Sequence, residues 1–254
     1  MQSKRSRLDR FISRHLQIPK KQVRLLLAQG RVMVDGVIAR DIDLQIDQFS
    51  HIICDGLVLQ QRQARYIMLN KPVGMVCATK DDKHRTVIDL LKETVNYSPN
   101  GIQPNNIQPN SNQVQCDDLH IVGRLDLNTS GLVLLTNDGQ WSKRIMSPEH
   151  KVNKRYLVTL KNPIDEEYVQ AFADGFYFAF EGITTLPATL EIVSSHRALV
   201  TLQEGRYHQI KRMFGRFRNP VVALHRLSVG DIRLDDTLLP GQSRQLTADE
   251  ITLV

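Results

Sequence analysis

The stretch His120-Ile-Val-Gly-Arg-Leu-Asp-Leu-Asn-Thr-Ser-Gly-Leu-Val-Leu-Leu-Thr-Asn-Asp-Gly139 decides the fold of the chain around it. Its apolar runs at 121–122 and 132–135 predict two strands, and the turn between them carries Gly123, Arg124 and Asp126. A carboxylate held between two strands can act as a nucleophile or as a general base. A surface ion pair of Arg124 with Asp126, or a simple Asx turn, fits the same spacing, so this pattern leaves the role of Asp126 open.

Strands and helices alternate on both sides of this turn. Apolar runs predict further strands at 66–69, 75–78, 156–160, 188–193 and 198–202, and helical spacing predicts helices at 86–92, 165–173 and 207–217. Their mixed order indicates an α+β domain around a curved, mostly antiparallel sheet rather than a doubly wound one. A polar bridge precedes this body, which we place at residues 63–254.

Residues 96–117 interrupt the body with a different composition. Three copies of one five-residue unit, PNGIQ, PNNIQ and PNSNQ, occupy 99–113. Such a segment has too little apolar surface to offset the entropy of ordering it. We therefore predict a disordered Asn/Gln/Pro-rich insert without a catalytic role, an RNA-contacting loop being the alternative.

Basic residues concentrate at the start of the chain. Residues 1–65 hold twelve Lys and Arg against six Asp and Glu, so they carry the whole net charge of +6. Nine of the twelve are candidate RNA-binding residues: Lys4, Arg5, Arg7, Arg10, Arg14, Lys20, Lys21, Arg24 and Arg31. A compact basic module is typical of a protein that binds a polyanion. Solvated faces of ordinary surface helices are the alternative.

This basic module, residues 1–62, has clear turn signals. Apolar spacing predicts a helix at 6–16 and a second one from Pro19 to about Gly30, while Asp35-Gly36 and Asp55-Gly56 predict two tight hairpins. The stretches RLDRFISRHL and KKQVRLLLAQGRVMVDG resemble the α-L RNA-binding fold named after a small-subunit ribosomal protein. A DNA-reading helix-turn-helix fits the hairpins poorly.

A second polar stretch, Glu204-Gly-Arg-Tyr-His-Gln-Ile-Lys-Arg-Met-Phe214, has helical spacing. Ile210, Met213 and Phe214 share one face of the helix, Lys211 borders that face, and Arg212 lies opposite. A lysine in that position can reach a buried carboxylate, and such a pair at 4 Å interacts by about 4 kcal/mol at an effective dielectric of 20. For Arg212 we predict an RNA-facing role.

Six motifs that follow the basic module, in order, resemble the RsuA family of pseudouridine synthases. They are YIMLNKPVGMVC, GRLD, DGQWSKRI, KRY, EGRYHQIKRMF and LHR…G.IRL, and only the Asn/Gln/Pro insert departs from the pattern. The resemblance implies that Asp126 is the catalytic carboxylate and that Lys211 pairs with it. It also implies that Arg124 fills the space left by the flipped uridine and that Tyr156 lies against the uracil or its sugar.

The resemblance also implies the reaction, which converts uridine to pseudouridine without a cofactor or a metal. DGQWSKRI and EGRYHQIKRMF are most similar to members that act on 16S ribosomal RNA, which implies uridine 516 as the target. The implied partner is 16S rRNA or a small-subunit assembly intermediate, and the implied state is a monomer. The same reaction on large-subunit rRNA or tRNA is one alternative, and a non-catalytic RNA-binding ribosome-assembly factor is the other.

The composition excludes several classes of protein. No apolar run approaches the roughly 20 residues of a membrane span, and the N-terminus lacks the apolar core of a signal peptide. Cys54, Cys77 and Cys116 form no CxxC pair, which argues against a disulfide framework or a structural zinc site. We expect a cytoplasmic protein without a membrane partner.

Overall fold

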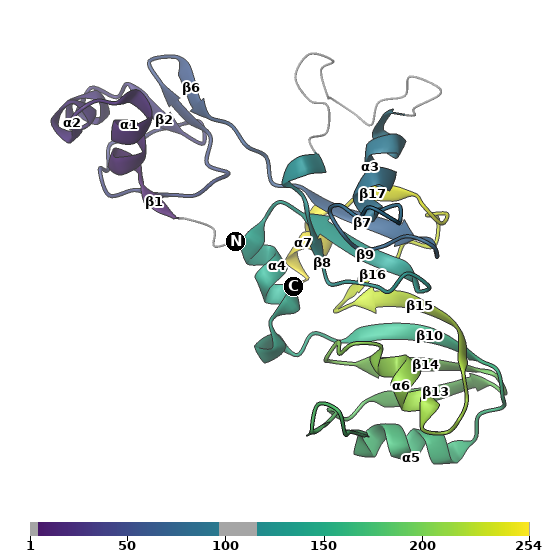
Figure 1. The fold of residues 1–254 in the computed structure, drawn as a ribbon. Coiled ribbons are helices and arrows are strands. Elements are labelled where there is room, and N and C mark those ends of the chain that lie inside the picture. The colour runs from purple at the N-terminus through teal and green to yellow at the C-terminus, as the bar shows by residue number, and fades with distance from the viewer. Residues whose placement is uncertain (1–4, 97–115, 254) are drawn as a thin grey trace. The chain divides into compact units, whose positions relative to one another are not determined.

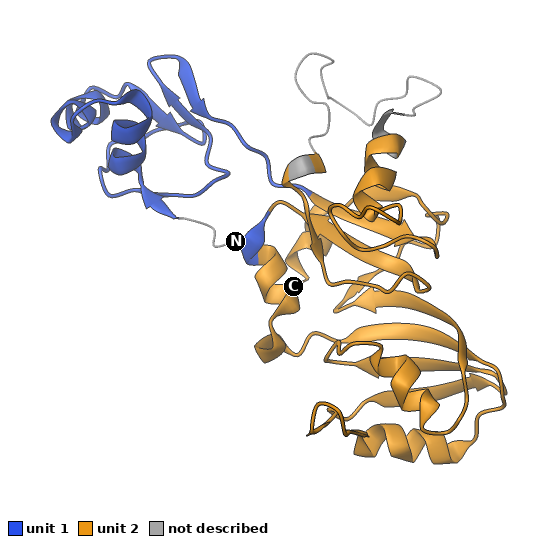
Figure 2. Ribbon diagram, in the orientation of Figure 1, with its two compact units in different colours: residues 1–65, 138–140 blue, residues 66–137, 141–254 orange. Residues whose placement is uncertain are grey.

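The computed structural model describes residues 5–96 and 116–253 (Figure 1). The chain forms two compact units, residues 1–65 with 138–140 and residues 66–137 with 141–254 (Figure 2). The boundary between residues 65 and 66 lies three residues after the domain boundary expected at residue 62. Most of the predicted insert, 97–115, lies outside the described residues. Its two ends differ from the prediction, because a helix ends at Asn96 and Cys116–Asp118 forms a 3-10 turn.

The first unit contains two helices and short strands. These are β1 (Ser6–Arg7), α1 (Leu8–Leu16), α2 (Lys20–Ala28), β2 (Val32–Val34), β3 (Val37–Ile38), β4 (Gln45–Ile46), β5 (Ile52–Cys54) and β6 (Leu57–Gln60). The main sheet has the order β3-β2-β5-β6, and β1 pairs with β4. Leu8, Ile12, Val23 and Leu27 of the two helices are buried in one apolar core with the sheet. The predicted helices and hairpins of the basic module are confirmed.

The second unit is built on one nine-stranded sheet. Its strands are β7 (Tyr66–Lys71), β8 (His120–Val122), β9 (Ser130–Thr136), β10 (Lys154–Leu160), β13 (Thr189–Ser194), β14 (Arg197–Leu202), β15 (Val221–Val229), β16 (Ile232–Arg233) and β17 (Ser243–Gln245). A separate hairpin pairs β11 (Tyr177–Phe178) with β12 (Ile183–Thr184). The helices are α3 (Val87–Asn96), η1 (Cys116–Asp118), α4 (Gly139–Met146), η2 (Pro148–His150), α5 (Glu166–Asp174), α6 (Gln209–Gly215) and α7 (Ala248–Thr252).

The large sheet joins two antiparallel halves through one short parallel pairing. Its order is β13-β14-β10-β15-β9-β7-β17, with β16 on β15 and β8 on β9. At the junction, Ser130 and Gly131 of β9 pair in parallel with His225 and Arg226 of β15. Gly131 has φ +102°, and a Cβ there would collide with the main chain of Arg226, so the two strands can approach only at a glycine. The predicted α+β class and the mostly antiparallel sheet are confirmed.

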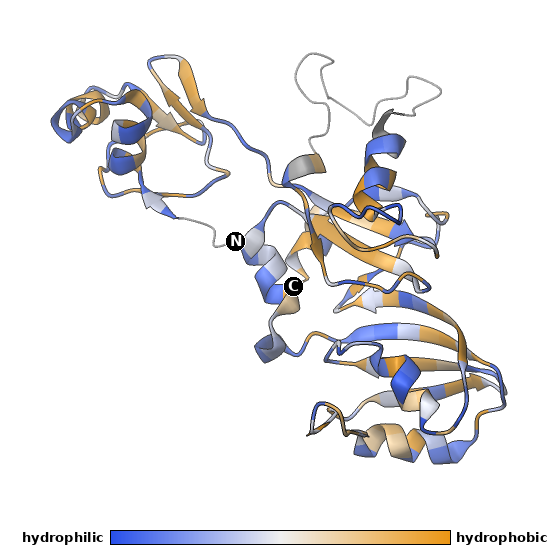
Figure 3. Ribbon diagram, viewed as in Figure 1, coloured by the Kyte–Doolittle hydropathy of each residue, from blue (hydrophilic) through white to orange (hydrophobic). Residues whose placement is uncertain are grey.

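The central strands of the large sheet are rich in hydrophobic residues (Figure 3), and these residues divide between two cores. Val133 and Leu135 of β9 join the larger core, which also holds residues of α3, α5 and α6. Leu132 and Leu134 point to the other face, where they share a core with Trp141 of α4. A strand that is buried on both sides needs a continuous apolar run, which explains the unbroken sequence of residues 132–135.

Several elements differ from the prediction. Residues 75–78 do not form a strand and make only an isolated bridge between Val76 and Thr86. The longest strand, β15, and the helix α4 were not among the predicted elements. Helix α6 is shorter than predicted, because it begins at Gln209 and ends at Gly215.

Near the C-terminus, the Asp235 carboxylate links Thr237 and Arg244 through hydrogen bonds that depend on its ionisation. Its carboxylate accepts hydrogen bonds from the Thr237 hydroxyl (2.6 Å), the Thr237 N–H (2.9 Å) and Arg244 Nε (2.6 Å), which lower its pKa from 3.8 to about 2. Because the pKa is lower in the folded chain, this group stabilises the fold above about pH 4 and loses that effect as the pH falls towards 2.

We therefore expect Asp235→Asn to flatten the fall of the free energy of unfolding between about pH 4 and pH 2. Urea titrations at a series of pH values measure this slope. Asp236→Asn, at an exposed neighbouring position, is the control and should keep the wild-type slope. An unchanged slope in Asp235→Asn would contradict the assignment.

Candidate active site

Asp126 lies in the loop between β8 and β9 and receives two side chains from the start of α6. Lys211 Nζ donates to Asp126 Oδ2 at 3.2 Å, and His208 Nε2 lies 3.4 Å from the same oxygen. The Asp126 and Lys211 side chains are 34% and 29% exposed. The carboxylate is therefore held beside a positive charge and is still open to a substrate.

Lys71, at the end of β7, holds the main chain around Asp126 in place through hydrogen bonds. Its side chain is fully buried, and Nζ donates to the carbonyl oxygens of Thr129 (2.7 Å), Pro72 (2.9 Å), Asp126 (3.2 Å) and Leu127 (3.4 Å). Burial lowers the pKa of Lys71. Hydrogen bonds from a charged donor are among the stronger ones in proteins, so Lys71 ties down the chain that follows the carboxylate.

Arg226, on β15, fixes the chain that precedes the carboxylate. It is 2% exposed, and its guanidinium donates to the carbonyl oxygens of Leu132 (2.7 Å), Gly123 (3.3 Å) and Arg124 (3.4 Å). The Leu125 N–H donates to the buried Cys77 thiol at 3.3 Å, and burial raises the pKa of that thiol. Two buried cations therefore hold opposite ends of the Asp126 loop through its carbonyl groups.

The start of α6 has a strained main chain. His208, the residue just before the helix, has φ 51° and ψ 30°, in the left-handed region that residues other than glycine rarely adopt. Within the helix, Ile210, Met213 and Phe214 are buried in the core, which leaves Lys211 at the border of that face. This arrangement directs both His208 and Lys211 towards Asp126.

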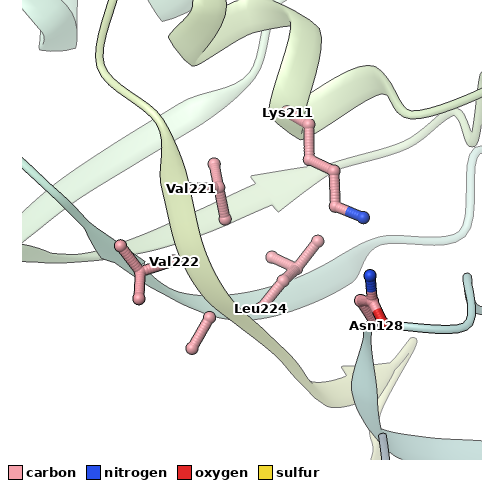
Figure 4. Close-up of a pocket in the computed structure, with 6 residues that line it drawn as sticks. Asn128, Lys211, Val221, Val222 and Leu224 are labelled. Atoms are coloured by element: carbon pink, nitrogen blue, oxygen red, sulfur yellow. The ribbon is translucent and has the colours of Figure 1, made fainter. Parts of the chain in front are cut away.

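A cavity of about 380 Å³ adjoins the Asp126–Lys211 pair (Figure 4). Its lining residues are Asn128, Lys211, Val221, Val222, Ala223 and Leu224. Figure 4 shows the Lys211 and Asn128 side chains pointing towards each other on one side and the aliphatic side chains of β15 on the other. Its volume lies within the range of small-ligand sites.

Tyr156 and Arg124 lie in the same unit but make different contacts. Tyr156 is 8% exposed on β10, opposite Arg226, where the register of the two strands shifts by a bulge. Bulges often occur beside active sites, where they redirect a side chain. Arg124 is exposed, and its side chain forms no hydrogen bond or ion pair within the described part of the chain. Neither side chain bonds to Asp126 among the described residues.

Arg212 is engaged within the protein instead of facing outward. Its guanidinium forms a two-fold ion pair with Glu181 (2.6 and 2.7 Å) and lies 3.6 Å from the centroid of the Phe178 ring. These contacts attach α6 to the segment that joins β11 and β12. The RNA-facing role predicted for Arg212 stays a prediction, since its side chain is still 28% exposed beside these partners.

The basic residues of the first unit divide into two groups. Arg7 is paired with Asp9 and Asp43, and Arg31 with Asp55. The exposed side chains of the second group make no ion pair in the described residues, and they are Arg5, Arg10, Arg14, Lys20, Lys21 and Arg24. Lys4 lies outside the described residues. Apart from Arg5, the second group provides a set of unpaired positive charges on the two helices.

In residues 5–96 and 116–253, no helix is long and apolar enough to cross a membrane. The same residues bring together no group of three His, Cys, Asp or Glu side chains that could hold a metal ion.

Sequence reasoning from motifs missed Lys71, Arg226 and His208. The two buried cations carry a signal that could have found them, since each interrupts or ends an apolar strand, in YIMLNK and in VVALHRLSV. A charged residue at such a position is buried only when it is fully hydrogen-bonded. His208 carries no comparable signal, because its position depends on a left-handed main chain.

Comparison with known proteins agrees with this arrangement. Family models described as RNA pseudouridylate synthase and S4 domain match residues 65–215 and 6–52. The ribosomal small subunit pseudouridine synthase A of Pseudomonas aeruginosa is 46% identical over 98% of this chain and 100% of its own length. The protein of that name from Escherichia coli (strain K12) is 42% identical over 98% and 99%.

A solved structure shows the same likeness. The crystal structure of a pseudouridylate synthase has 39% sequence identity and a TM-score of 0.65, and the match covers 98% of this chain and 99% of that one. With the matching family model and the full-length relatives, this likeness settles the family. The chain belongs to the RsuA family of RNA pseudouridylate synthases, with an S4 domain before the synthase domain.

Proposed function

We propose that this enzyme converts one uridine of 16S ribosomal RNA, uridine 516, to pseudouridine, with Asp126 as its catalytic carboxylate. The observation that carries the proposal is the Asp126–Lys211 pair, which is partly exposed beside a cavity. The buried cations Lys71 and Arg226 hold the loop that carries Asp126. Two relatives named as small-subunit pseudouridine synthases are 46% and 42% identical over nearly the whole chain, which supports 16S rRNA as the substrate. The enzyme acts as a monomer in the cytoplasm, on 16S rRNA or on an assembling small subunit.

In this proposal the reaction proceeds at the Asp126 carboxylate. The bond from C1′ of the ribose to N1 of uracil breaks with its electron pair left on N1, the base turns, and C1′ joins C5. C5 then loses its proton and N1 takes one up, so the product is an isomer of the substrate. Asp126 either attacks the ribose or removes a proton from it, and both routes need the anion that the Lys211 charge stabilises at 3.2 Å. Because Lys71 and Arg226 hold the loop, the carboxylate needs little rearrangement before it reacts.

The uridine must leave its stack in the RNA before it can reach the carboxylate. Unstacking costs a few kcal/mol, which contacts to the flipped base and to the vacated space have to offset. Tyr156 is proposed to lie against the base or its sugar, and the unpaired Arg124 to occupy the vacated space. The cavity beside Lys211 then holds the detached base while it turns.

The S4 domain supplies RNA affinity through its unpaired charges. We expect simultaneous replacement of Arg10, Arg14, Lys20, Lys21 and Arg24 by Gln to weaken RNA binding and to reduce the slope of log K against log salt by about three to four units. Each phosphate contact contributes roughly 0.7 to 0.9 to that slope. Filter binding or fluorescence anisotropy at several salt concentrations measures it.

Arg31→Gln provides the matched control for this set, because Arg31 is already paired with Asp55. It should change the slope by less than one unit. An unchanged slope in the fivefold variant would place the main RNA surface on the synthase domain.

Mapping of pseudouridine tests the proposed substrate directly. Ribosomal and transfer RNA from cells with and without the gene are treated with a carbodiimide that marks pseudouridine, and reverse-transcription stops are compared. Loss of the mark at uridine 516 of 16S rRNA is the expected result. Loss of the mark at a uridine of large-subunit rRNA or of tRNA would show that the enzyme has a different target RNA but carries out the same reaction. No change in any RNA, together with normal RNA binding, would favour a non-catalytic assembly factor.

A further inference from the structure

Tyr207 presents a large aromatic surface to solvent beside the catalytic carboxylate. It is 75% exposed, in the segment between β14 and α6. Its ring is stacked on that of His208, with 3.9 Å between the ring centroids and 18° between the planes. One face of the tyrosine ring is therefore supported and the other is open, which is the arrangement that proteins use to stack an unpaired base.

His208 connects this aromatic stack to the reacting centre. Its Nε2 atom lies 3.4 Å from Asp126 Oδ2, so the same ring contacts both the tyrosine and the carboxylate. The main chain of His208 is left-handed, with φ 51° and ψ 30°, just before α6 begins. The ring that supports Tyr207 is therefore itself held at the Asp126 carboxylate.

The charges around Tyr207 suit an RNA strand. Lys211, four residues after Tyr207, is bonded to Asp126. The nearest carboxylate in the sequence, Glu204, is occupied by Arg206 at 2.8 Å, by Gln209 at 2.6 Å and by the Leu186 N–H at 3.0 Å. The acid nearest to Tyr207 in the sequence is therefore already paired and repels a passing phosphate less than a free carboxylate would.

We propose that Tyr207, backed by His208, is a stacking platform for the nucleobase next to the target uridine. The neighbouring base stays on the open face of the tyrosine while the uridine turns out of the strand towards Asp126. Tyr207 is thus a positioning residue that binds the RNA strand, separate from the groups that act on the uridine. This inference rests on the proposed function, because it needs RNA at the Asp126 site.

The test uses the full-length enzyme and a short RNA that contains the uridine identified by mapping. Two versions of the RNA carry 2-aminopurine on the 5′ or the 3′ side of that uridine, and stacking on an aromatic ring quenches its fluorescence. Wild-type enzyme should quench one of the two. Tyr207→Ala should lose that quenching and raise the half-saturating RNA concentration by about 10- to 100-fold, with a smaller change in the rate at saturation.

Two further variants separate stacking from a structural role. Tyr207→Phe keeps the ring without the hydroxyl and should retain both the quenching and the half-saturating concentration. Phe180→Ala removes an aromatic ring that is 98% exposed, between β11 and β12, and should leave both unchanged. Thermal melting of each variant checks the fold and should stay at the wild-type value.

The inference is overturned if Tyr207→Ala binds and quenches both RNAs like the wild type. It is also overturned if Tyr207→Phe fails in the same way as Tyr207→Ala, because the hydroxyl would then be the important group. If no uridine is modified in any RNA, the proposed function fails instead. The same variants are then compared on a single strand that carries 2-aminopurine, where loss of quenching in Tyr207→Ala still supports the platform and unchanged quenching still overturns it.

Discussion

Asp126→Asn is expected to abolish pseudouridine formation, with a loss of at least about 10³-fold in the single-turnover rate, since an amide can neither attack the ribose nor accept its proton. The fold should be preserved, because the Asp126 side chain is a third exposed and its carboxylate bonds only to Lys211 and His208 within the described chain. RNA affinity should change little. Release of tritium from uridine labelled at C5 measures the rate, and thermal melting measures the fold.

Asp231→Asn is the control for this variant, because Asp231 is an exposed aspartate in the turn between β15 and β16. It should turn over at the wild-type rate. Turnover by Asp126→Asn within about tenfold of the wild type would show that another group carries out the reaction.

Lys71→Met should lower both the stability and the activity of the enzyme. Methionine fills a similar volume but leaves the Thr129 and Pro72 carbonyl oxygens without their donor, and each buried unsatisfied acceptor costs about 1–3 kcal/mol. We expect the free energy of unfolding to fall by about 2–5 kcal/mol. Under conditions where the variant is still folded, the single-turnover rate should fall by about 10²-fold, because the released loop misplaces Asp126.

Arg244→Met separates the two effects of Lys71→Met. Arg244 binds Asp235 and Glu250, and so stabilises the C-terminal helix α7 without a bond to the Asp126 loop. It should lower stability as well, while the folded variant keeps its rate. If Lys71→Met and Arg244→Met lost activity only in proportion to unfolding, Lys71 would be a structural residue without a role in positioning Asp126.

The parts of the fold that the sequence predicted are those with a regular apolar period. The run at 132–135 is fully buried on two faces, and the hairpins at Asp35-Gly36 and Asp55-Gly56 have the positive φ angles that this turn chemistry demands. Strand β15 escaped prediction because His225 and Arg226 interrupt its apolar residues. Residues 75–78 were predicted as a strand because they are apolar. Met75 and Cys77 are indeed buried, but this segment packs into the core without pairing as a strand.

The contact between Asp126 and Lys211 was predicted from the sequence, and the residues that hold the surrounding loop were missed. Asp126 and Lys211 stood out through family motifs, and the structure brings them within 3.2 Å of each other. Lys71 and Arg226 donate to main-chain carbonyl groups that are far away in the sequence. Every residue has a main-chain carbonyl, so no pattern of residue types identifies these acceptors. Only the three-dimensional fold identifies these bonds, and the same holds for the left-handed main chain of His208.

The short parallel junction between β9 and β15 has a consequence for the order of folding. It joins positions 95 residues apart, Ser130 and His225, whereas the flanking hairpin β13–β14 forms from residues that are neighbours in the chain. Because closing a long loop costs more entropy than closing a short one, local hairpins should form early and the junction late. Asp126 precedes the junction on one strand and Lys211 precedes it on the other, so their pairing waits for that last closure. A folding intermediate would already contain most of the secondary structure and yet be inactive, and catalytic activity would report the completion of folding more faithfully than circular dichroism.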